Sequence, residues 1–277
     1  MVYTNLFIGA CAVAMFYHSR IIMGLHAPAF TTTAFIFFST VSAYSILKIR
    51  PFLSKTHTAA SDYTLWLAKN KVSAYTVLAS ASIIAGLLAF TLSAIQLALV
   101  ILAGFITLVY SIPFIGNFSL RGLGILKTFF VAVVWIIMTT IISFDANIHD
   151  LGDKMISVML SNLFFILPLC IAFEIKDMDD DEAAGLLTIP MYLGIGKTKM
   201  LAIAIPICYI AASFIIFVYN GAGAPTEPAQ TITTMLPSIA SVVVLQQLNK
   251  ESSSYYFQVL IDGLMLLQFL CTFIAYS

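Results

Sequence analysis

Residues 155–173, MISVMLSNLFFILPLCIAF, are followed directly by residues 174–182, EIKDMDDDE. The first part is uncharged and about as long as the 20 or so residues that an α-helix needs to cross the core of a bilayer. The second part holds six acidic residues and one lysine. The junction therefore predicts a transmembrane helix that ends in an acidic segment at the membrane surface.

The rest of the chain repeats the apolar pattern. Of 277 residues, 61% are apolar and only 9% are charged, and the mean hydropathy is +1.00, which excludes a soluble globular domain. We therefore expect an all-α membrane protein with nine transmembrane helices in a single domain, residues 1–277. The expected spans are 2–17, 21–47, 72–120 as two helices reversing at 91–96, 128–144, 155–173, 200–226, 228–249 and 255–276.

Charge distribution orients these spans. Eleven Lys and Arg residues fall in the loops on one side, whereas Arg20 and Lys154 fall on the other. The positive-inside rule then predicts a cytoplasmic N-terminus and a multi-pass protein of the inner or plasma membrane, with its basic and acidic loops in the cytoplasm. Because thirteen cations balance thirteen acids, the composition points to a lipid bilayer as partner and not to nucleic acid.

The two longest charged loops on that side differ in sign. The basic loop, residues 48–71, has five cations and one acid, Asp62. Asp62 suits the first turn of a helix, and Tyr63, Trp66 and Leu67 follow at helical spacing, so we expect a short helix at the depth of the lipid headgroups.

The acidic loop predicts a cation site. If the helix continues past residue 173, Glu174, Asp177 and Asp181 lie on one face at i, i+3 and i+7. Three carboxylates repel one another unless a cation binds them, and hard oxygen ligands suit Mg²⁺ shared with substrate phosphates. The alternative is a solvated acidic loop.

Two segments resemble a known family. Residues 174–194, EIKDMDDDEAAGLLTIPMYLG, resemble the second aspartate-rich motif of the UbiA superfamily of intramembrane prenyltransferases, loosely DxxDxxxD…G…TLPxxLG. Residues 110–135 resemble the family's segment between its fourth and fifth helices. The resemblance implies a UbiA-like bundle around a cavity open to lipid, in which Mg²⁺ holds a polyprenyl diphosphate donor while a lipophilic, often aromatic acceptor attacks the allylic carbon. It also implies that Glu174, Asp177 and Asp181 bind metal and that Asp177, Asp181, Arg121 and Lys127 are catalytic.

The family's first motif, NDxxDxxxD, is missing. Its expected place, residues 39–50, reads STVSAYSILKIR and contains no carboxylate. We hypothesise that Lys48 and Arg50 bind phosphate oxygens directly where the lost aspartates would have held a metal. The alternative is that these two cations anchor their helix at the interface.

Other candidates follow from position. Ionisation of an allylic diphosphate needs stabilisation of the leaving group and a dry cavity, and aromatic rings stabilise cations, so Tyr44 and Tyr110 are candidate substrate-binding residues. The alternative is that they belong to the belt of aromatic residues at the membrane interface. Asp262 is the one acid well inside a span and is a candidate for substrate binding or for a structural polar contact. Two other function classes remain open, namely a non-catalytic isoprenoid- or lipid-binding relative and a secondary transporter.

Overall fold

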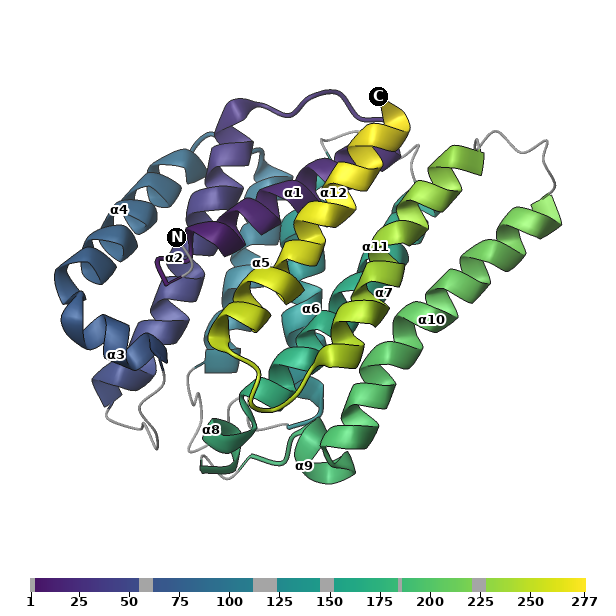
Figure 1. The fold of residues 1–277 in the computed structure, drawn as a ribbon. Helices are drawn as coiled ribbons and strands as arrows, with labels where there is room; N and C mark the ends of the chain where they lie inside the picture. Colours follow the sequence, from purple (N-terminus) through teal and green to yellow (C-terminus); the bar gives the residue numbers. More distant parts are fainter. Residues whose placement is uncertain (1–2, 55–61, 112–123, 145–151, 184–185, 221–227) are drawn as a thin grey trace.

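The computed structural model describes residues 3–54, 62–111, 124–144, 152–183, 186–220 and 228–277, and among these there are helices and no β-strand. The long helices run side by side through the molecule (Figure 1). The helical elements are α1 (Leu6–Met23), α2 (Phe30–Ser54), α3 (Asp62–Lys69), α4 (Lys71–Ala89), α5 (Ala94–Ser111), α6 (Leu126–Thr139), η2 (Ile141–Ser143), α7 (Gly152–Lys176), α8 (Met178–Ala183), α9 (Ile189–Leu193), α10 (Ile195–Asn220), α11 (Pro228–Gln247), η4 (Tyr256–Ile261) and α12 (Asp262–Tyr276).

Seven helices in the described residues are long and apolar enough to cross a membrane, as the composition predicts. Two shorter apolar helices, Ala94–Val109 and Met235–Gln247, fall within further expected spans. The reversal expected at residues 91–96 is confirmed, because α4 ends at Ala89 and α5 begins at Ala94. The expected short helix is confirmed as α3, whose Leu67 is fully buried against Ile49 and Ala74.

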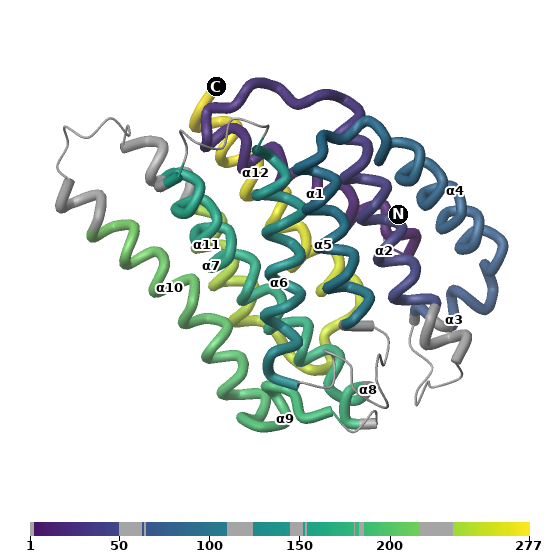
Figure 2. Tube along the Cα trace, turned by 180° about the vertical axis from the view of Figure 1, so that it is seen from behind, coloured from purple at the N-terminus to yellow at the C-terminus, as the bar shows by residue number. Residues whose placement is uncertain are grey.

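The long helices pack around α1. Helix α2 packs on α4, α5 on α6, α6 on α7, α7 on α10, α10 on α11, and α11 on α12. Helix α1 contacts α2 and α12 and, less extensively, α6 and α7. It therefore lies in the middle of the bundle. The views in Figures 1 and 2 agree that α3, α8 and α9 gather at one end of the molecule, which we call the loop end.

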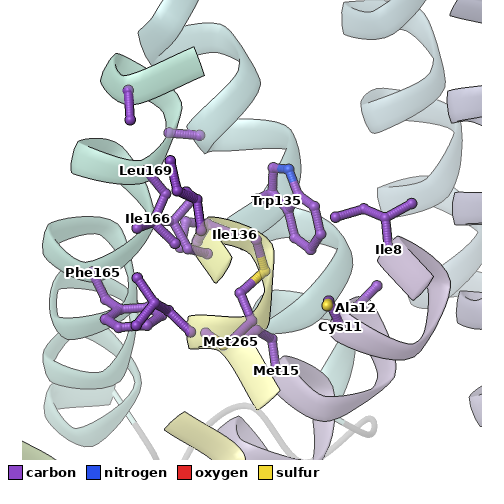
Figure 3. Packing of buried hydrophobic residues seen from close by; sticks show 14 of the residues in the cluster. Ile8, Cys11, Ala12, Met15, Trp135, Ile136, Phe165, Ile166, Leu169 and Met265 are labelled. Atoms are coloured by element: carbon purple, nitrogen blue, oxygen red, sulfur yellow. The ribbon is translucent and has the colours of Figure 1, made fainter. Parts of the chain in front are cut away.

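The core lies where α1, α6, α7 and α12 meet. Figure 3 shows side chains of these four helices converging, with Met15 of α1 near Met265 of α12, and Trp135 of α6 in the same layer. In a bilayer, lipid is as apolar as these side chains, so removing apolar surface from water does not drive the helices together. Close packing and buried polar contacts hold them together instead.

A buried polar network joins the same helices toward the other end. His18 of α1 contacts the Thr272 hydroxyl through Nδ1 at 2.7 Å and Asn162 Oδ1 through Nε2 at 3.1 Å. Asn162 Nδ2 donates to Thr140 Oγ1 at 2.8 Å and to Ser19 Oγ at 3.0 Å. Hydrogen bonds between helices are a favourable way to bury polar groups in a bilayer, so this network ties α1, α6, α7 and α12 together.

The first helix is longer than expected. The expected span ended at residue 17, whereas α1 continues to Met23 and so includes Arg20. Arg20 is accommodated because its guanidinium donates to the carbonyl oxygens of Ser143, at 2.7 Å, and His26, at 2.6 Å. A charged side chain near a helix end thus remains inside the bundle by binding backbone acceptors.

Candidate active site

Lys127 joins three helices at the loop end. It lies in the first turn of α6, and its ammonium forms an ion pair with Asp181 of α8 and a second one with Glu174 of α7, Nζ to Oε1 at 3.3 Å. The three side chains are 5%, 0% and 4% exposed. We call Lys127, Glu174 and Asp181 the acidic triad, because it carries two carboxylates and one ammonium.

The backbone places these groups by a bend. Helix α7 ends at Lys176, Asp177 lies at the bend, and α8 begins at Met178. The hydrogen bond from Asp181 N to Asp177 O, at 2.9 Å, keeps Asp181 one turn beyond the bend. The structure thus differs from the single continuous helix face expected from the sequence: Glu174 and Asp181 meet at Lys127, whereas the charge of Asp177 interacts with Lys48.

The loop preceding α6 depends on a glycine. Gly124 has φ +56°, and a Cβ atom at this position would lie 1.9 Å from the carbonyl oxygen of Leu187, between α8 and α9. Only glycine allows two backbones to approach so closely with this φ. This close contact between the backbones of Gly124 and Leu187 holds the start of α6, which includes Lys127, against the segment that follows Asp181.

One oxygen atom of the acidic triad lies beside the Thr128 hydroxyl, without the geometry of a hydrogen bond. Glu174 Oε2 is buried without a hydrogen-bond partner in the described residues, and the same holds for the hydroxyl oxygens of Thr128 and Thr188. Buried acceptors without partners are costly and point to a ligand or water in the working protein. Within the described part of the chain, no three His, Cys, Asp or Glu residues gather as a ready metal site, and Lys127 pairs with both Glu174 and Asp181.

A second group of charges lies beside the acidic triad. Lys48, near the end of α2, donates to Asn5 Oδ1 at 2.8 Å, and its charge interacts with Lys176, Asp262 and Asp177. Asp262 is 7% exposed and interacts with both lysines. We call Lys48, Lys176 and Asp262 the basic cluster. Sequence reasoning did not single out Lys176, although it is the only cation inside the acidic segment.

Aromatic rings surround the basic cluster. Lys176 Nζ lies 5.4 Å from the ring centre of Phe257 and 5.7 Å from that of Phe173, and Lys48 Nζ lies 5.5 Å from the ring of Tyr63. These distances permit cation–π attraction. Burial raises the pKa of Tyr63 to about 12, so the ring beside Lys48 is a neutral phenol.

Tyr44 lies deeper between α2 and α6. Its hydroxyl accepts a hydrogen bond from Trp135 Nε1 at 3.2 Å, so the two helices are bridged by a predicted substrate-binding residue. The side chains of Arg50 and Tyr110 lie outside the described part of the structure, and Arg121 lies outside the described residues altogether. Residues 39–49 of α2 contribute serines here, with Ser42 bound to Ser82 and Ser45 bound to Asn5.

Solved structures share this arrangement of helices. A UbiA homolog from Archaeoglobus fulgidus bound to GPP and Mg²⁺ matches with a TM-score of 0.64 at 12% identity, covering 100% of both chains. A UbiA homolog from Archaeoglobus fulgidus bound to DMAPP and Mg²⁺ matches with a TM-score of 0.61 at 13% identity, covering 100% of this chain and 99% of that one. An apo UbiA homolog from Aeropyrum pernix K1 matches at 0.64 and 16% identity, covering 96% and 94%. At such low identity, these likenesses show the fold.

Comparison of the sequence with known proteins shows the family of this chain. No curated protein matches the chain. The model of the UbiA prenyltransferase family matches residues 63–269, a range that contains the whole acidic triad and both Lys176 and Asp262 of the basic cluster. With a match over most of its length and a UbiA-like arrangement of helices, the chain belongs to the UbiA prenyltransferase family.

Proposed function

We propose that this membrane protein transfers an isoprenoid chain from a polyprenyl diphosphate to a lipophilic acceptor, with the diphosphate bound at the loop end. The observation that carries the proposal is the acidic triad. It is a buried arrangement of two carboxylates around one cation, and it lies in the segment that resembles the family's second aspartate-rich motif. The solved relatives in complex with GPP or DMAPP are bound to Mg²⁺ as well, which supports a diphosphate donor here.

The oxygen atoms of this region fit Mg²⁺ by their chemistry. Glu174 and Asp181 already surround a cation, the ammonium of Lys127, and Glu174 Oε2 still lacks a partner among the described residues. In the proposal, Glu174, Asp177 and Asp181 are the metal ligands. Bound Mg²⁺ would offset the charge of the departing diphosphate.

Lys127 has a second task in this proposal. The Lys127 ammonium would bind a phosphate oxygen of the donor if Glu174 and Asp181 held Mg²⁺. Arg121 is proposed to bind the diphosphate from the same loop. Tyr44 and Tyr110 would border the allylic chain, where aromatic faces stabilise developing positive charge and the apolar helices exclude water.

We propose nine transmembrane spans in a single domain, with the N-terminus and the loop end in the cytoplasm. Lysines near the ends of α2, α3, α7 and α10 gather at this end together with the acidic segment, which supports the orientation through the positive-inside rule. The donor would then be bound from the cytoplasmic leaflet.

Substitutions within one segment test the site. Asp177→Asn and Asp181→Asn should abolish Mg²⁺-dependent binding of geranyl diphosphate to the purified protein, measured by calorimetry. Asp179→Asn is the matched control, because its side chain is 67% exposed and, among the described residues, pairs with the exposed Lys250. Size-exclusion chromatography shows whether each variant is folded. Wild-type binding in both Asp177→Asn and Asp181→Asn would refute the metal site.

One observation favours a second candidate function. The described residues 39–49 provide no carboxylate where the family's first motif is expected, as a non-catalytic isoprenoid-binding relative would predict. Incubation of the pure protein with labelled polyprenyl diphosphates and a panel of aromatic and lipid acceptors distinguishes the transferase from the non-catalytic binding protein. Prenylated product supports the transferase, whereas tight binding without product across the panel supports the binding protein.

A further inference from the structure

An apolar groove lies between α10 and α11 at the edge of the bundle. Figures 1 and 2 show these two helices side by side, with α10 at the outer edge. The groove has a volume of about 360 Å³, which is within the range of ligand pockets in proteins. It is lined by Ile207, Ile210, Ala211, Phe214, Ile239 and Val242. Because all six side chains are apolar, the part of a ligand that fits here is a hydrocarbon chain.

The sequences of the two helices explain the groove. On α10 the lining residues recur at i, i+3, i+4 and i+7 from Ile207 to Phe214, so they form one helix face. Pro206 directly precedes this face on α10, and Pro237 precedes Ile239 by two positions on α11. A proline inside a helix removes a backbone hydrogen bond and kinks the helix. Since the helices run in opposite directions, one proline flanks the groove toward the loop end and the other flanks it on the far side.

The depth of the groove matches the lipid tails of one leaflet. Ile207 and Phe214 lie eight and fifteen residues beyond Lys199, or about 12 and 22 Å along the helix axis. Lysines near helix ends extend to the headgroup layer. The middle of the bilayer is about 20 Å below its polar surface. A lipid chain that starts at the loop end would therefore pass through the groove before it reaches the middle of the bilayer.

Lys199 lies where the two helices meet the loop end. It is half-buried, and its ammonium donates to the carbonyl oxygen of Leu248, just past the end of α11, at 2.9 Å. This contact uses one of the three N–H groups of the ammonium. In the part of the chain that the structure describes, Lys199 forms no ion pair, whereas Lys250 pairs with Asp179. A cation without a counter-charge, beside the positive N-terminal end of α10 and above an apolar groove, is complementary to a lipid with an anionic headgroup.

We propose that α10 and α11 together bind one anionic glycerophospholipid, with its phosphate at Lys199 and one acyl chain in the groove. Basic positions between the ends of transmembrane helices bind anionic headgroups in this way. The site is separate from the acidic triad and does not depend on the proposed transferase activity. Because α10 also packs on α9, the bound lipid would stabilise the segment that follows the acidic triad.

Thermal unfolding of the purified protein in detergent tests the headgroup site. Dioleoyl phosphatidylglycerol should raise Tm by about 3 °C or more above the value with the same amount of dioleoyl phosphatidylcholine, because a ligand of the native state stabilises it. Lys199→Met should lose this difference between the two lipids, and Lys199→Arg should keep it. Lys197→Met is the matched control, because Lys197 is an exposed lysine two positions away, and it should also keep the difference.

A second pair of variants tests the groove. Ala211→Leu fills the groove and should reduce the shift that phosphatidylglycerol causes. Ala212→Leu adds the same side chain at an exposed position that does not line the groove, and it should shift like the wild type. Glycerol 3-phosphate, which has the charged group and no acyl chain, should cause no shift in any variant.

Several results would overturn the proposal. Equal shifts with the two phospholipids in the wild type, or a phosphatidylglycerol-specific shift that survives Lys199→Met, would remove the headgroup site. A full shift in Ala211→Leu would remove the groove from it. A larger shift with an uncharged polyprenyl alcohol than with phosphatidylglycerol would assign the groove to an isoprenoid chain instead. A wild-type dimer that becomes a monomer in Ala211→Leu on size-exclusion chromatography would assign it to a second copy of the chain.

Discussion

Lys127 in the first turn of α6 forms a buried ion pair with Asp181 in α8, 54 positions further along the chain. The same ammonium binds Glu174 at 3.3 Å. In a membrane protein, such a pairing stabilises charges that would otherwise be very costly to bury. It also means that Lys127 holds carboxylate oxygens that a metal would need.

Lys127→Met should therefore destabilise the protein by about 3–5 kcal/mol, because two buried carboxylates lose their shared cation. Mg²⁺ should restore part of this loss, since a divalent ion can bind the freed oxygens. The measurement is thermal unfolding in detergent with and without Mg²⁺. Lys197→Met serves as the control for losing one lysine and should unfold like the wild type. A Lys127→Met protein of wild-type stability would refute the role of the triad.

Gly124→Ala should displace the segment around Leu187, because the added Cβ would lie 1.9 Å from the Leu187 carbonyl oxygen at a φ of +56°. We expect faster proteolysis of the loops at this end and weaker Mg²⁺-dependent donor binding. Gly104→Ala is the matched control, since a Cβ at Gly104 of α5 meets nothing within 4 Å. If Gly124→Ala and Gly104→Ala show the same proteolysis and the same affinity, the close approach has no role in the site.

His18→Leu should lower stability without changing diphosphate affinity. The substitution removes the His18 contacts of Asn162 Oδ1 and of the Gln268 amide, at a cost of about 1–3 kcal/mol, whereas the Thr272 hydroxyl keeps its hydrogen bond to the carbonyl oxygen of Gln268. His26→Leu is the control, because the His26 side chain is exposed and only its backbone oxygen binds Arg20. Thermal unfolding and diphosphate calorimetry on the same samples separate stability from binding. Loss of affinity in a stable His18→Leu protein would place the network in the site.

Tyr44→Phe should cost about 1 kcal/mol of stability and also weaken donor binding. The change removes the acceptor for the buried Trp135 N–H group and alters a ring proposed to border the allylic chain. Tyr209→Phe is the comparison, since it removes a similar hydrogen bond, Tyr209 to Ser161, between α7 and α10. Equal donor affinity in the two variants would make Tyr44 a structural residue only.

Local features of the chain were predictable from the sequence. The apolar spans, the reversal before Ala94, the short helix α3 and the position of the acidic segment follow from the hydropathy and helical spacing of neighbouring residues. Each depends on the free energy of moving a short segment from water into lipid, which is a property of that segment alone. The candidate site residues Asp177 and Asp181 were predicted in the same way, because their spacing lies within one segment.

The pairing of charges could not be read from the chain. The same acidic segment would be a solvated loop if Lys127 pointed elsewhere, and nothing in its own residues shows that Lys176 lies over the ring of Phe257 while Glu174 pairs with Lys127. Which charges meet depends on how α2, α6, α7 and α12 pack and on the bend at Asp177. Helix packing decides which distant charges lie close enough to pair. The pairs matter for stability, because burying a charge without a partner has a large free-energy cost.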